Sequence, residues 1–252
     1  MHTSVTNATA LFLGSVLFAA CSTATMPSTP TAPVEVAAAQ TPPAGVPVPP
    51  MPPPPPAPET ARYRVTFEAR WSPSTHPLEI PGSAHFSALV GGTHNASVSF
   101  WREGGQASRG IMDMAERGRT SPLDTEITTA ISGGTAENVF TGGAIDKSPG
   151  TISLEFTATQ RFPLVTLVSM VAPSPDWFVG VSGLALFENG RWVEERRVEL
   201  DPWDAGTDSG VSFFSPDSVT VPPAPVSRII TAPLSPDGRV TPLGSFVFTR
   251  IN

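Results

Sequence analysis

The sequence contains little of several residue types that common functional sites require. Cysteine occurs once in 252 residues, as Cys21, so the chain can form neither an intramolecular disulfide nor a cysteine-based zinc cluster. Only 15% of the residues are charged, the single lysine is Lys147, and Arg196-Arg197 is the only adjacent basic pair. Since no basic stripe could follow a phosphate backbone, the composition argues against nucleic-acid binding. The net charge of −7 is a mild acidity.

Motifs typical of enzymes are also missing from the sequence. It contains no glycine-rich phosphate loop, no nucleophile elbow and no internal repeat. No stretch pairs a nucleophile with a general base, which nucleophilic catalysis needs. We therefore expect a protein that is not an enzyme.

The first 21 residues have the pattern of an export signal. The apolar run Ala10–Ala20 has eleven residues, too few for a membrane-spanning helix, and it ends directly before Cys21. The segment "LFAAC" resembles a bacterial lipobox, which implies that Cys21 is diacylated and anchors the chain to a membrane. Phe18 departs from the usual Leu, Val or Ile, and residues 1–9 lack Lys and Arg, so a plain secretory signal is the alternative. Both interpretations predict an exported protein of the bacterial cell envelope or surface.

Residues 22–60 form a proline-rich linker. Fourteen prolines occur between Met26 and Pro58, among them the run "PPMPPPPPAP" at Pro49–Pro58. Proline removes backbone donors and fixes φ, so we expect a disordered stalk that favours polyproline II rather than a packed domain. A proline-rich ligand for a partner domain is the alternative.

Residues 61–252 form the expected folded domain. In Arg62–Trp71, apolar and polar residues alternate with period two, which predicts a half-buried strand. Gly91-Gly92, Asn189-Gly190 and Asp237-Gly238 are predicted turns. Further strands are predicted at Ser97–Trp101, Thr151–Thr157, Leu164–Val171, Phe178–Ala185, Trp192–Leu200, Val211–Phe214 and Phe246–Ile251.

Helix is expected in one place only, at about residues 108–131. Ile111–Glu116 predicts a short helical turn, and Ser121-Pro122 predicts the start of a helix with Ser121 as the N-cap. Many short strands with one helical excursion predict an all-β protein, an antiparallel β-sandwich or barrel.

Two loops carry acids that could act together. Asp204 and Asp208 lie in "PWDAGTDSG", where glycines permit tight turns, and Asp176 lies in "APSPDWF". Calcium takes about six to eight oxygen ligands, so two aspartates of one loop need a third acid from elsewhere, such as Asp176. Spacing alone leaves open whether these are calcium ligands or solvated turn acids.

Several long segments resemble a known family. "VAPSPDWFVGVSGL" (Val171–Leu184) and "DPWDAGTDSGVSFFSP" (Asp201–Pro216) resemble the spondin-type domain of the F-spondin and mindin family of extracellular-matrix proteins. Three earlier segments agree in the same order: "YRVTFEARWSPSTHP", "HFSALVGGTHN" and "WREGGQASRGIMDMAERG". The resemblance runs from about Tyr63 to the C-terminus and implies an antiparallel β-sandwich.

The resemblance also implies a bound Ca²⁺, held here by Asp176, Asp204 and Asp208. It suggests a further acid on the preceding strand, for which Glu155 in "ISLEF" is the nearest candidate. Animal members carry cysteines in this domain and thrombospondin-type repeats after it, and this sequence has neither. The resemblance favours adhesion to an unknown protein or glycan at the cell surface. A metal-dependent hydrolase and a purely structural envelope protein are the alternatives.

Three histidines, His76, His85 and His94, are spaced nine residues apart and raise the alternative of a zinc site. Odd spacing places successive residues on opposite faces of a continuous strand, and Pro77 and Pro81 interrupt the run. We expect them to be hydrogen-bonding residues of the scaffold. The five tryptophans mostly flank predicted strands, and we expect them in the core and its rim.

Overall fold

The computed structural model describes residues 56–252. The chain divides into two compact units, Met1–Pro52 and Pro53–Asn252, and the folded domain belongs to the second. The predicted export signal, Cys21 and most of the proline-rich linker lie outside the described residues. Among the helices of residues 56–252, none has the length and apolar character needed to cross a bilayer.

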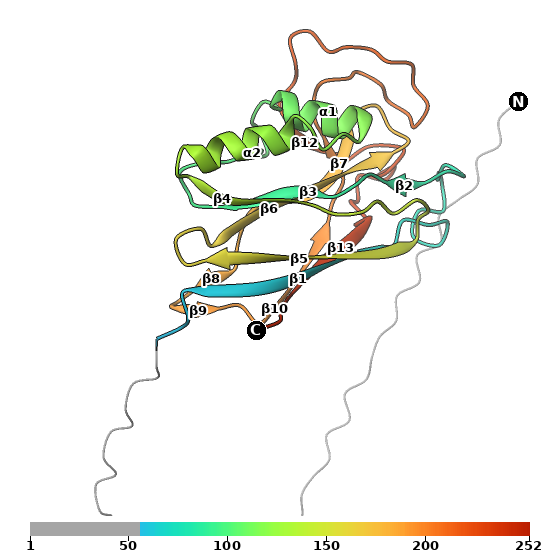
Figure 1. Ribbon diagram of the computed structural model, residues 1–252. Coiled ribbons are helices and arrows are strands. Elements are labelled where there is room, and N and C mark those ends of the chain that lie inside the picture. Colours follow the sequence, from blue (N-terminus) through green and yellow to red (C-terminus); the bar gives the residue numbers. More distant parts are fainter. Residues whose placement is uncertain (1–55) are drawn as a thin grey trace, which may run out of the picture. The chain divides into compact units, whose positions relative to one another are not determined.

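The domain consists of two facing antiparallel sheets and a small hairpin (Figure 1). The four-stranded sheet has the order β10 (Glu195–Leu200), β13 (Gly244–Arg250), β1 (Thr60–Ala69) and β5 (Gly150–Thr159). The larger sheet has the order β12 (Ser227–Arg228), β11 (Trp203–Asp204), β7 (Trp177–Ala185), β6 (Leu164–Ala172), β3 (Val90–His94) and β4 (Ala136–Thr141), with β2 (His85–Phe86) paired to β6. The hairpin is β8 (Phe187–Glu188) with β9 (Arg191–Trp192). The predicted antiparallel β-sandwich is confirmed.

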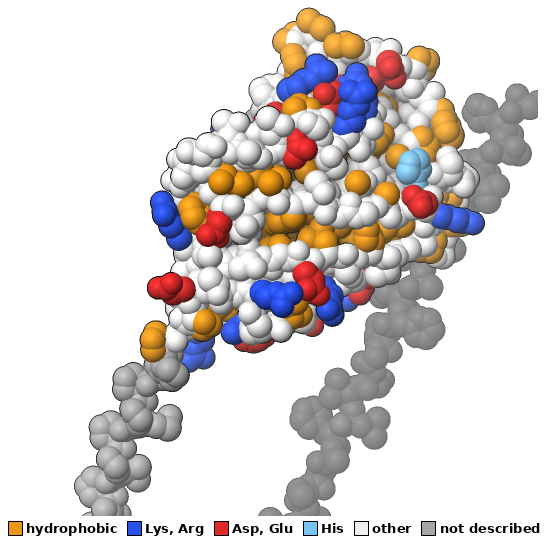
Figure 2. All heavy atoms as spheres, viewed as in Figure 1, with side chains coloured by type: hydrophobic (Ala, Val, Ile, Leu, Met, Phe, Trp, Pro, Cys, Tyr) orange, Lys and Arg blue, Asp and Glu red, His pale blue; other side chains and the backbone are white. Residues whose placement is uncertain are grey.

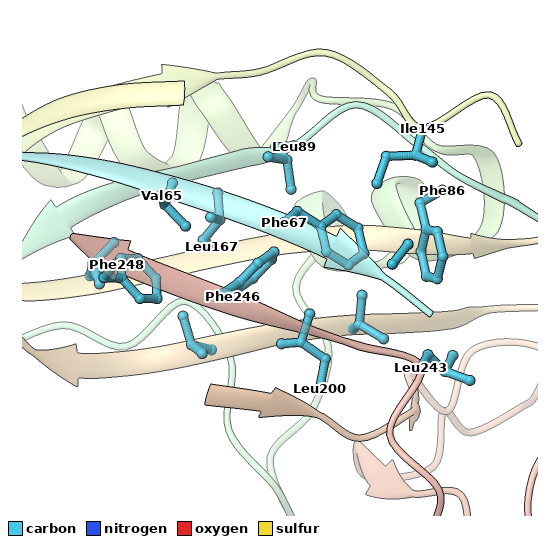
Figure 3. Packing of buried hydrophobic residues seen from close by; sticks show 14 of the residues in the cluster. Val65, Phe67, Phe86, Leu89, Ile145, Leu167, Leu200, Leu243, Phe246 and Phe248 are labelled. Carbon is cyan, nitrogen blue, oxygen red and sulfur yellow. The ribbon is translucent and has the colours of Figure 1, made fainter. Parts of the chain in front are cut away.

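The alternation in β1 explains how the two sheets share one core. Tyr63, Val65, Phe67 and Ala69 are buried, whereas Arg62 and Arg64 face solvent. The inward side chains of β1 and β13 meet those of the other sheet, and Figure 3 shows Phe67, Phe246 and Leu167 pointing into the same space. Phe67 packs edge-to-face on Phe86 at 4.8 Å between ring centroids, and on Phe246 at 5.1 Å. Aromatic packing thus takes the place of disulfides in this cysteine-poor domain.

The helical excursion consists of two helices, α1 (Arg109–Arg117) and α2 (Leu123–Ser132), which cover the outer face of the larger sheet (Figure 1). Ser108 caps α1 by accepting a hydrogen bond from the Ile111 amide, and the Glu126 carboxylate of α2 accepts one from the Gly110 amide at 2.7 Å. The predicted N-cap of the second helix is wrong by one residue. Pro122 is the capping residue, and it makes no side-chain hydrogen bond.

Some local predictions are wrong because tertiary packing overrides local preference. Gly91-Gly92 is not a turn but the centre of the buried strand β3. A Cβ atom on Gly91 would lie 2.1 Å from the Thr166 carbonyl oxygen, and one on Gly92 would lie 2.7 Å from Ile127, so both glycines permit close packing of neighbouring elements. Ser97–Trp101 and Val211–Phe214, which were predicted as strands, are irregular segments, and the predicted strand Trp192–Leu200 is divided between β9 and β10.

The sandwich has two distinct ends along β1. At the first end, where β1 begins, Trp192 of the hairpin packs on Tyr63. At the other end Trp71, which follows β1, packs against Phe213 of the long segment after β11, with 5.5 Å between ring centroids. Ten residues of strand, at about 3.3 Å each, separate these ends by about 30 Å. We call the second end the loop end, defined by Ala172–Asp176 and the segment 205–226.

Candidate functional site: a cluster of three aspartates at the loop end

Strand pairing brings Asp176 and Asp204 together. Asp176 directly precedes β7, and Trp177 pairs with Asp204 of β11 in the antiparallel register. The Ala205 amide donates a hydrogen bond to the Asp176 carbonyl at 3.1 Å. The two loops that the sequence predicts to share a site therefore meet at one edge of the larger sheet.

The Asp176 carboxylate is fully buried, with 0% of the residue exposed, and only one of its oxygens is hydrogen-bonded. Its Oδ2 accepts hydrogen bonds from the amides of Thr207 at 2.7 Å and Asp208 at 3.1 Å, and from the Thr207 hydroxyl at 3.3 Å. Its Oδ1 has no hydrogen-bond partner. A buried charged oxygen without a partner is costly, because it loses its hydration and gains nothing in return.

Asp204 and Asp208 shape the loop around Asp176. Asp204 Oδ1 accepts a hydrogen bond from the Gly206 amide at 2.7 Å, and Asp208 Oδ1 accepts one from the Gly210 amide at 2.7 Å. These are Asx-type turns, in which the side chain bonds the backbone two residues later. Asp208 Oδ2 also accepts a hydrogen bond from the Ser218 amide at 2.8 Å. Both oxygens of Asp208 therefore hold the loop closed.

Gly206 is required by this loop geometry. Its φ of 76° lies in the left-handed region, and a Cβ there would lie 2.1 Å from the Ala224 carbonyl oxygen. The Gly206 carbonyl in turn accepts a hydrogen bond from the Ala224 amide at 2.8 Å. The glycine lets the returning part of the segment pass close behind the aspartates.

The three aspartates have no cationic partner to offset their charge. No salt bridge of the described residues involves any of them. Burial raises the pKa of Asp176 to about 6, and the charge of Asp204 adds to the rise, against the hydrogen bonds from Thr207 and Asp208. Burial also raises the pKa of Asp204, which the Gly206 amide and the Trp177 side chain oppose and the charge of Asp208 reinforces. The cluster thus carries more negative charge than its surroundings compensate.

Solvent reaches Asp204 from one side. Asp204 lines a hollow of about 390 Å³ together with Trp177, Gly210, Val211 and Arg228. Asp176 does not line this hollow and is fully buried behind it.

The donor set fits a hard cation in part. Carboxylate and carbonyl oxygens are the ligands that calcium prefers, and the unpaired Oδ1 of Asp176 lacks the partner that a cation would supply. Among residues 56–252, no group of three His, Cys, Asp or Glu side chains is arranged to hold a metal ion. Each Asp208 oxygen already accepts one backbone hydrogen bond, which leaves each a second lone pair. Of the three aspartates, Asp176 has the carboxylate oxygen without a hydrogen-bond partner, and Asp204 lines the hollow that opens to solvent.

The fourth candidate acid, Glu155, is not brought to this cluster. It lies on β5 of the four-stranded sheet, where its carboxylate binds Arg64 at 2.7 Å and Arg62 at 2.9 Å. Hydrogen bonding by Arg64 lowers the pKa of Glu155, in contrast to the rise at Asp176.

The three histidines make separate hydrogen bonds within the scaffold. His94 contacts the Thr166 hydroxyl at 2.8 Å, His85 contacts the Ser83 carbonyl at 2.7 Å, and His76 contacts the Thr75 hydroxyl at 3.0 Å. Burial lowers the pKa of both His76 and His94. None of them belongs to a metal-binding group among the described residues.

Sequence reasoning missed the role of Thr207. Its amide and hydroxyl both donate to Asp176, so it fixes the carboxylate from the opposite loop. The signal lies in the spacing of "DAGTDSG", where the residue between two Asx turns has its amide free to point outward.

Comparison with known protein families agrees with this arrangement. The family model described as Spondin_N matches residues 61–239, which include both β-sheets except β13 and all three aspartates. The chain belongs to the spondin N-terminal domain family. Human Spondin-2 is 37% identical over 195 residues, and rat Spondin-2 is 38% identical over 195 residues. Mouse Spondin-1 is 35% identical over 209 residues.

The spondin-type domain is the shared part of these proteins. The matched region is 76% of this chain in each of the three comparisons, but 57% of human Spondin-2, 58% of rat Spondin-2 and 25% of mouse Spondin-1. The chain therefore spans just over half the length of the Spondin-2 proteins and a quarter of Spondin-1.

Proposed function

We propose that this protein is an exported binding module that attaches to a protein or glycan partner at the cell surface or in the surrounding matrix. Membership of the spondin family supports a binding role, because the sequence resembles the domain of extracellular-matrix proteins. The loop end is the binding face in this proposal.

Exposed hydrophobic side chains at the loop end support its assignment as the binding face. Phe214 is 72% exposed and Val221 is 83% exposed, although both are large apolar residues. Val211 and Val219 of the same segment are also exposed, as is Ile230 shortly after it. Figure 2 shows hydrophobic side chains gathered at the top of the molecule, where the long segment after β11 projects. Exposed apolar patches of this kind are typical of interaction sites.

We further propose that Ca²⁺ binds at the aspartate cluster and fixes these loops. The observation that carries the proposal is the fully buried Asp176, whose unpaired Oδ1 lies in a cluster with no compensating cation. Asp176 and Asp204 would supply carboxylate oxygens, and Asp208 would join them through a lone pair that its backbone hydrogen bonds leave free. The ion would supply positive charge and tie the β6–β7 loop to the segment after β11.

The N-terminal part of the proposal is a lipid anchor at Cys21, which would tether the domain to a bacterial envelope membrane through the proline-rich linker. It rests on the "LFAAC" sequence, which lies outside the described residues. Detergent partitioning of the wild type against Cys21→Ala tests it, because loss of the anchor shifts the variant to the aqueous phase.

Thermal unfolding with and without a chelator tests the ion. A ligand that binds only the folded state stabilises it by about 2.7 kcal/mol at 100 times its Kd. For a domain of this size, we expect calcium to raise Tm by about 5–10 °C. Asp176→Asn should abolish the response, whereas Asp217→Asn, which changes an exposed acid of the same segment, should keep it. Equal calcium responses in the wild type and Asp176→Asn would contradict the proposed site.

A further inference from the structure

The domain binds the last residues of its own proline-rich linker. The Trp192 indole nitrogen donates a hydrogen bond to the Pro58 carbonyl at 2.7 Å. The side-chain amide of Gln160 donates to the carbonyls of Ala57 and Pro58, both at 3.1 Å. The Gln160 backbone amide adds a bond to the Glu59 carbonyl at 2.9 Å. The carbonyls of three consecutive residues, Ala57, Pro58 and Glu59, are therefore hydrogen-bonded to the domain directly before β1 begins.

The surface that makes these contacts is rigidly built. Trp192 is only 4% exposed and packs edge-to-face on Phe187, with 5.0 Å between ring centroids. The Tyr63 hydroxyl contacts the carbonyls of Leu186 and Val193, on either side of the hairpin, at 3.1 and 2.6 Å. The core strand β1 thus holds the hairpin in place, and the indole N–H has a fixed direction.

A hollow of about 650 Å³ continues this surface toward the linker. It is lined by Pro56, Ala57 and Pro58 on the linker side and by residues 189–192, Glu194 and Arg250 on the domain side. Arg250 and Glu194 form a salt bridge at 2.8 Å at its edge. Pro56, Ala57 and Pro58 thus form one wall of the hollow and leave its interior open.

The chemistry of the hollow suits polyproline. A polyproline II segment has no amide donors and leaves its carbonyl oxygens free, so it is recognised by aromatic rings together with side-chain N–H donors. Trp192 lines the hollow and Phe187 packs on it. Trp192 and Gln160 already hold the carbonyls of Ala57 and Pro58 at its edge. The residues immediately before them belong to the unbroken run Pro52–Pro56.

We propose that the hollow beside the β8–β9 hairpin is a polyproline-binding groove whose occupant is the chain's own segment Pro53–Pro56. The connection between the domain and the end of its linker is then rigid rather than freely rotating. This groove lies at the start of β1, about 30 Å from the loop end. This inference depends neither on calcium nor on the identity of a partner.

Spin labelling of the full-length chain tests the groove. In a Cys21→Ser background, one nitroxide is placed at Pro53→Cys and a second, in a separate protein, at Ala38→Cys upstream in the linker. We expect the label at position 53 to rotate several-fold more slowly than the label at position 38. Gln160→Ala, which changes an exposed residue, and Trp192→Phe, which keeps an aromatic ring but removes the N–H donor, should both release the label at position 53.

Gln106→Ala is the matched control, because Gln106 is exposed and lies in the loop between β3 and α1; it should leave the label at position 53 slow. Equal mobility at positions 53 and 38 in the wild-type domain overturns the proposal, as does slow motion at position 53 that persists in Gln160→Ala and Trp192→Phe. If the label is mobile and an added proline-rich peptide quenches Trp192 fluorescence, the groove serves another chain and the assigned occupant is wrong.

Discussion

Two buried aspartates in this domain have opposite surroundings. Asp113, on α1, is 4% exposed and binds two arginines, Arg109 at 3.0 Å and Arg117 at 2.7 Å. Asp176 is 0% exposed, binds no arginine or lysine, and has the like charge of Asp204 acting on it. The same residue type is thus neutralised by the protein on the helix side and left uncompensated at the loop end. This difference is what motivates the proposal that a cation from outside the chain completes the loop end.

Removing the charge of Asp176 should have the largest effect on stability, because it abolishes the difference between the two aspartates. A rise of its pKa from 3.8 to about 6 corresponds to roughly 3 kcal/mol of folding free energy lost at neutral pH. In chelator at pH 7.5, Asp176→Asn should therefore raise the free energy of unfolding by roughly 1–3 kcal/mol, the lower values reflecting weaker hydrogen bonds from Thr207 and Asp208. Urea unfolding of both proteins measures this difference in the free energy of unfolding. A variant less stable than the wild type in chelator would show that the buried charge is compensated.

The pH dependence of stability is a second test of whether the charge of Asp176 is uncompensated. Because the folded-state pKa of Asp176 is raised, the folded chain binds the extra proton between about pH 4 and pH 6. As the pH rises from about 4 to about 6, the free energy of unfolding of the calcium-free wild type should therefore fall relative to that of Asp176→Asn. Above pH 6 it should stay lower. Glu68, Glu155 and Glu188 have lowered pKa values and the opposite pH dependence, but they are common to both proteins. Parallel wild-type and variant curves from pH 4 to pH 7 would refute the expectation.

Asp113→Asn should lower the free energy of unfolding, which is the opposite of the effect expected for Asp176→Asn. It removes the charge that two arginines bind, and both arginines are partly exposed, so we expect a loss of about 1–2 kcal/mol at pH 7.5. The calcium response of Tm should stay as in the wild type. Thermal unfolding with and without calcium measures both, and a lost calcium response would contradict the separation of the two sites.

Glu155→Gln should have the smallest effect. Its carboxylate is partly exposed and pairs only with surface arginines, so we expect no measurable change in Tm and none in the calcium response. A weakened calcium response would place Glu155 in the metal site, contrary to its position on β5.

The sequence predicted the framework of the fold well where local pattern and burial agree. The alternation of β1 identified four inward-facing residues, and the turn Asn189-Gly190 lies between β8 and β9 as predicted. Prediction failed where packing between distant segments decides the conformation. Gly91 and Gly92 have the local signature of a turn, yet close contacts with Thr166 and Ile127 make them part of a central strand. Val211–Phe214 has the composition of a strand but pairs with no neighbour.

The candidate site shows the same limit. Asp176, Asp204 and Asp208 were named from their loops and from the family resemblance, and strand pairing brings them together. Glu155 was named as the nearest match to an acid that the family resemblance suggests, but it lies on β5 of the other sheet. Which oxygens stay free could not be read from the sequence, because hydrogen bonds from Thr207, Gly210 and Ser218 decide it.

The most direct test of the account is a crystal structure of the protein grown with calcium, with the ion identified by anomalous scattering. We expect one peak at about 2.3–2.6 Å from Asp176 Oδ1 and from an oxygen of Asp204. A structure at saturating calcium with no ion at this cluster, and with Asp176 Oδ1 still unpaired, would contradict the claim that external positive charge completes the loop end.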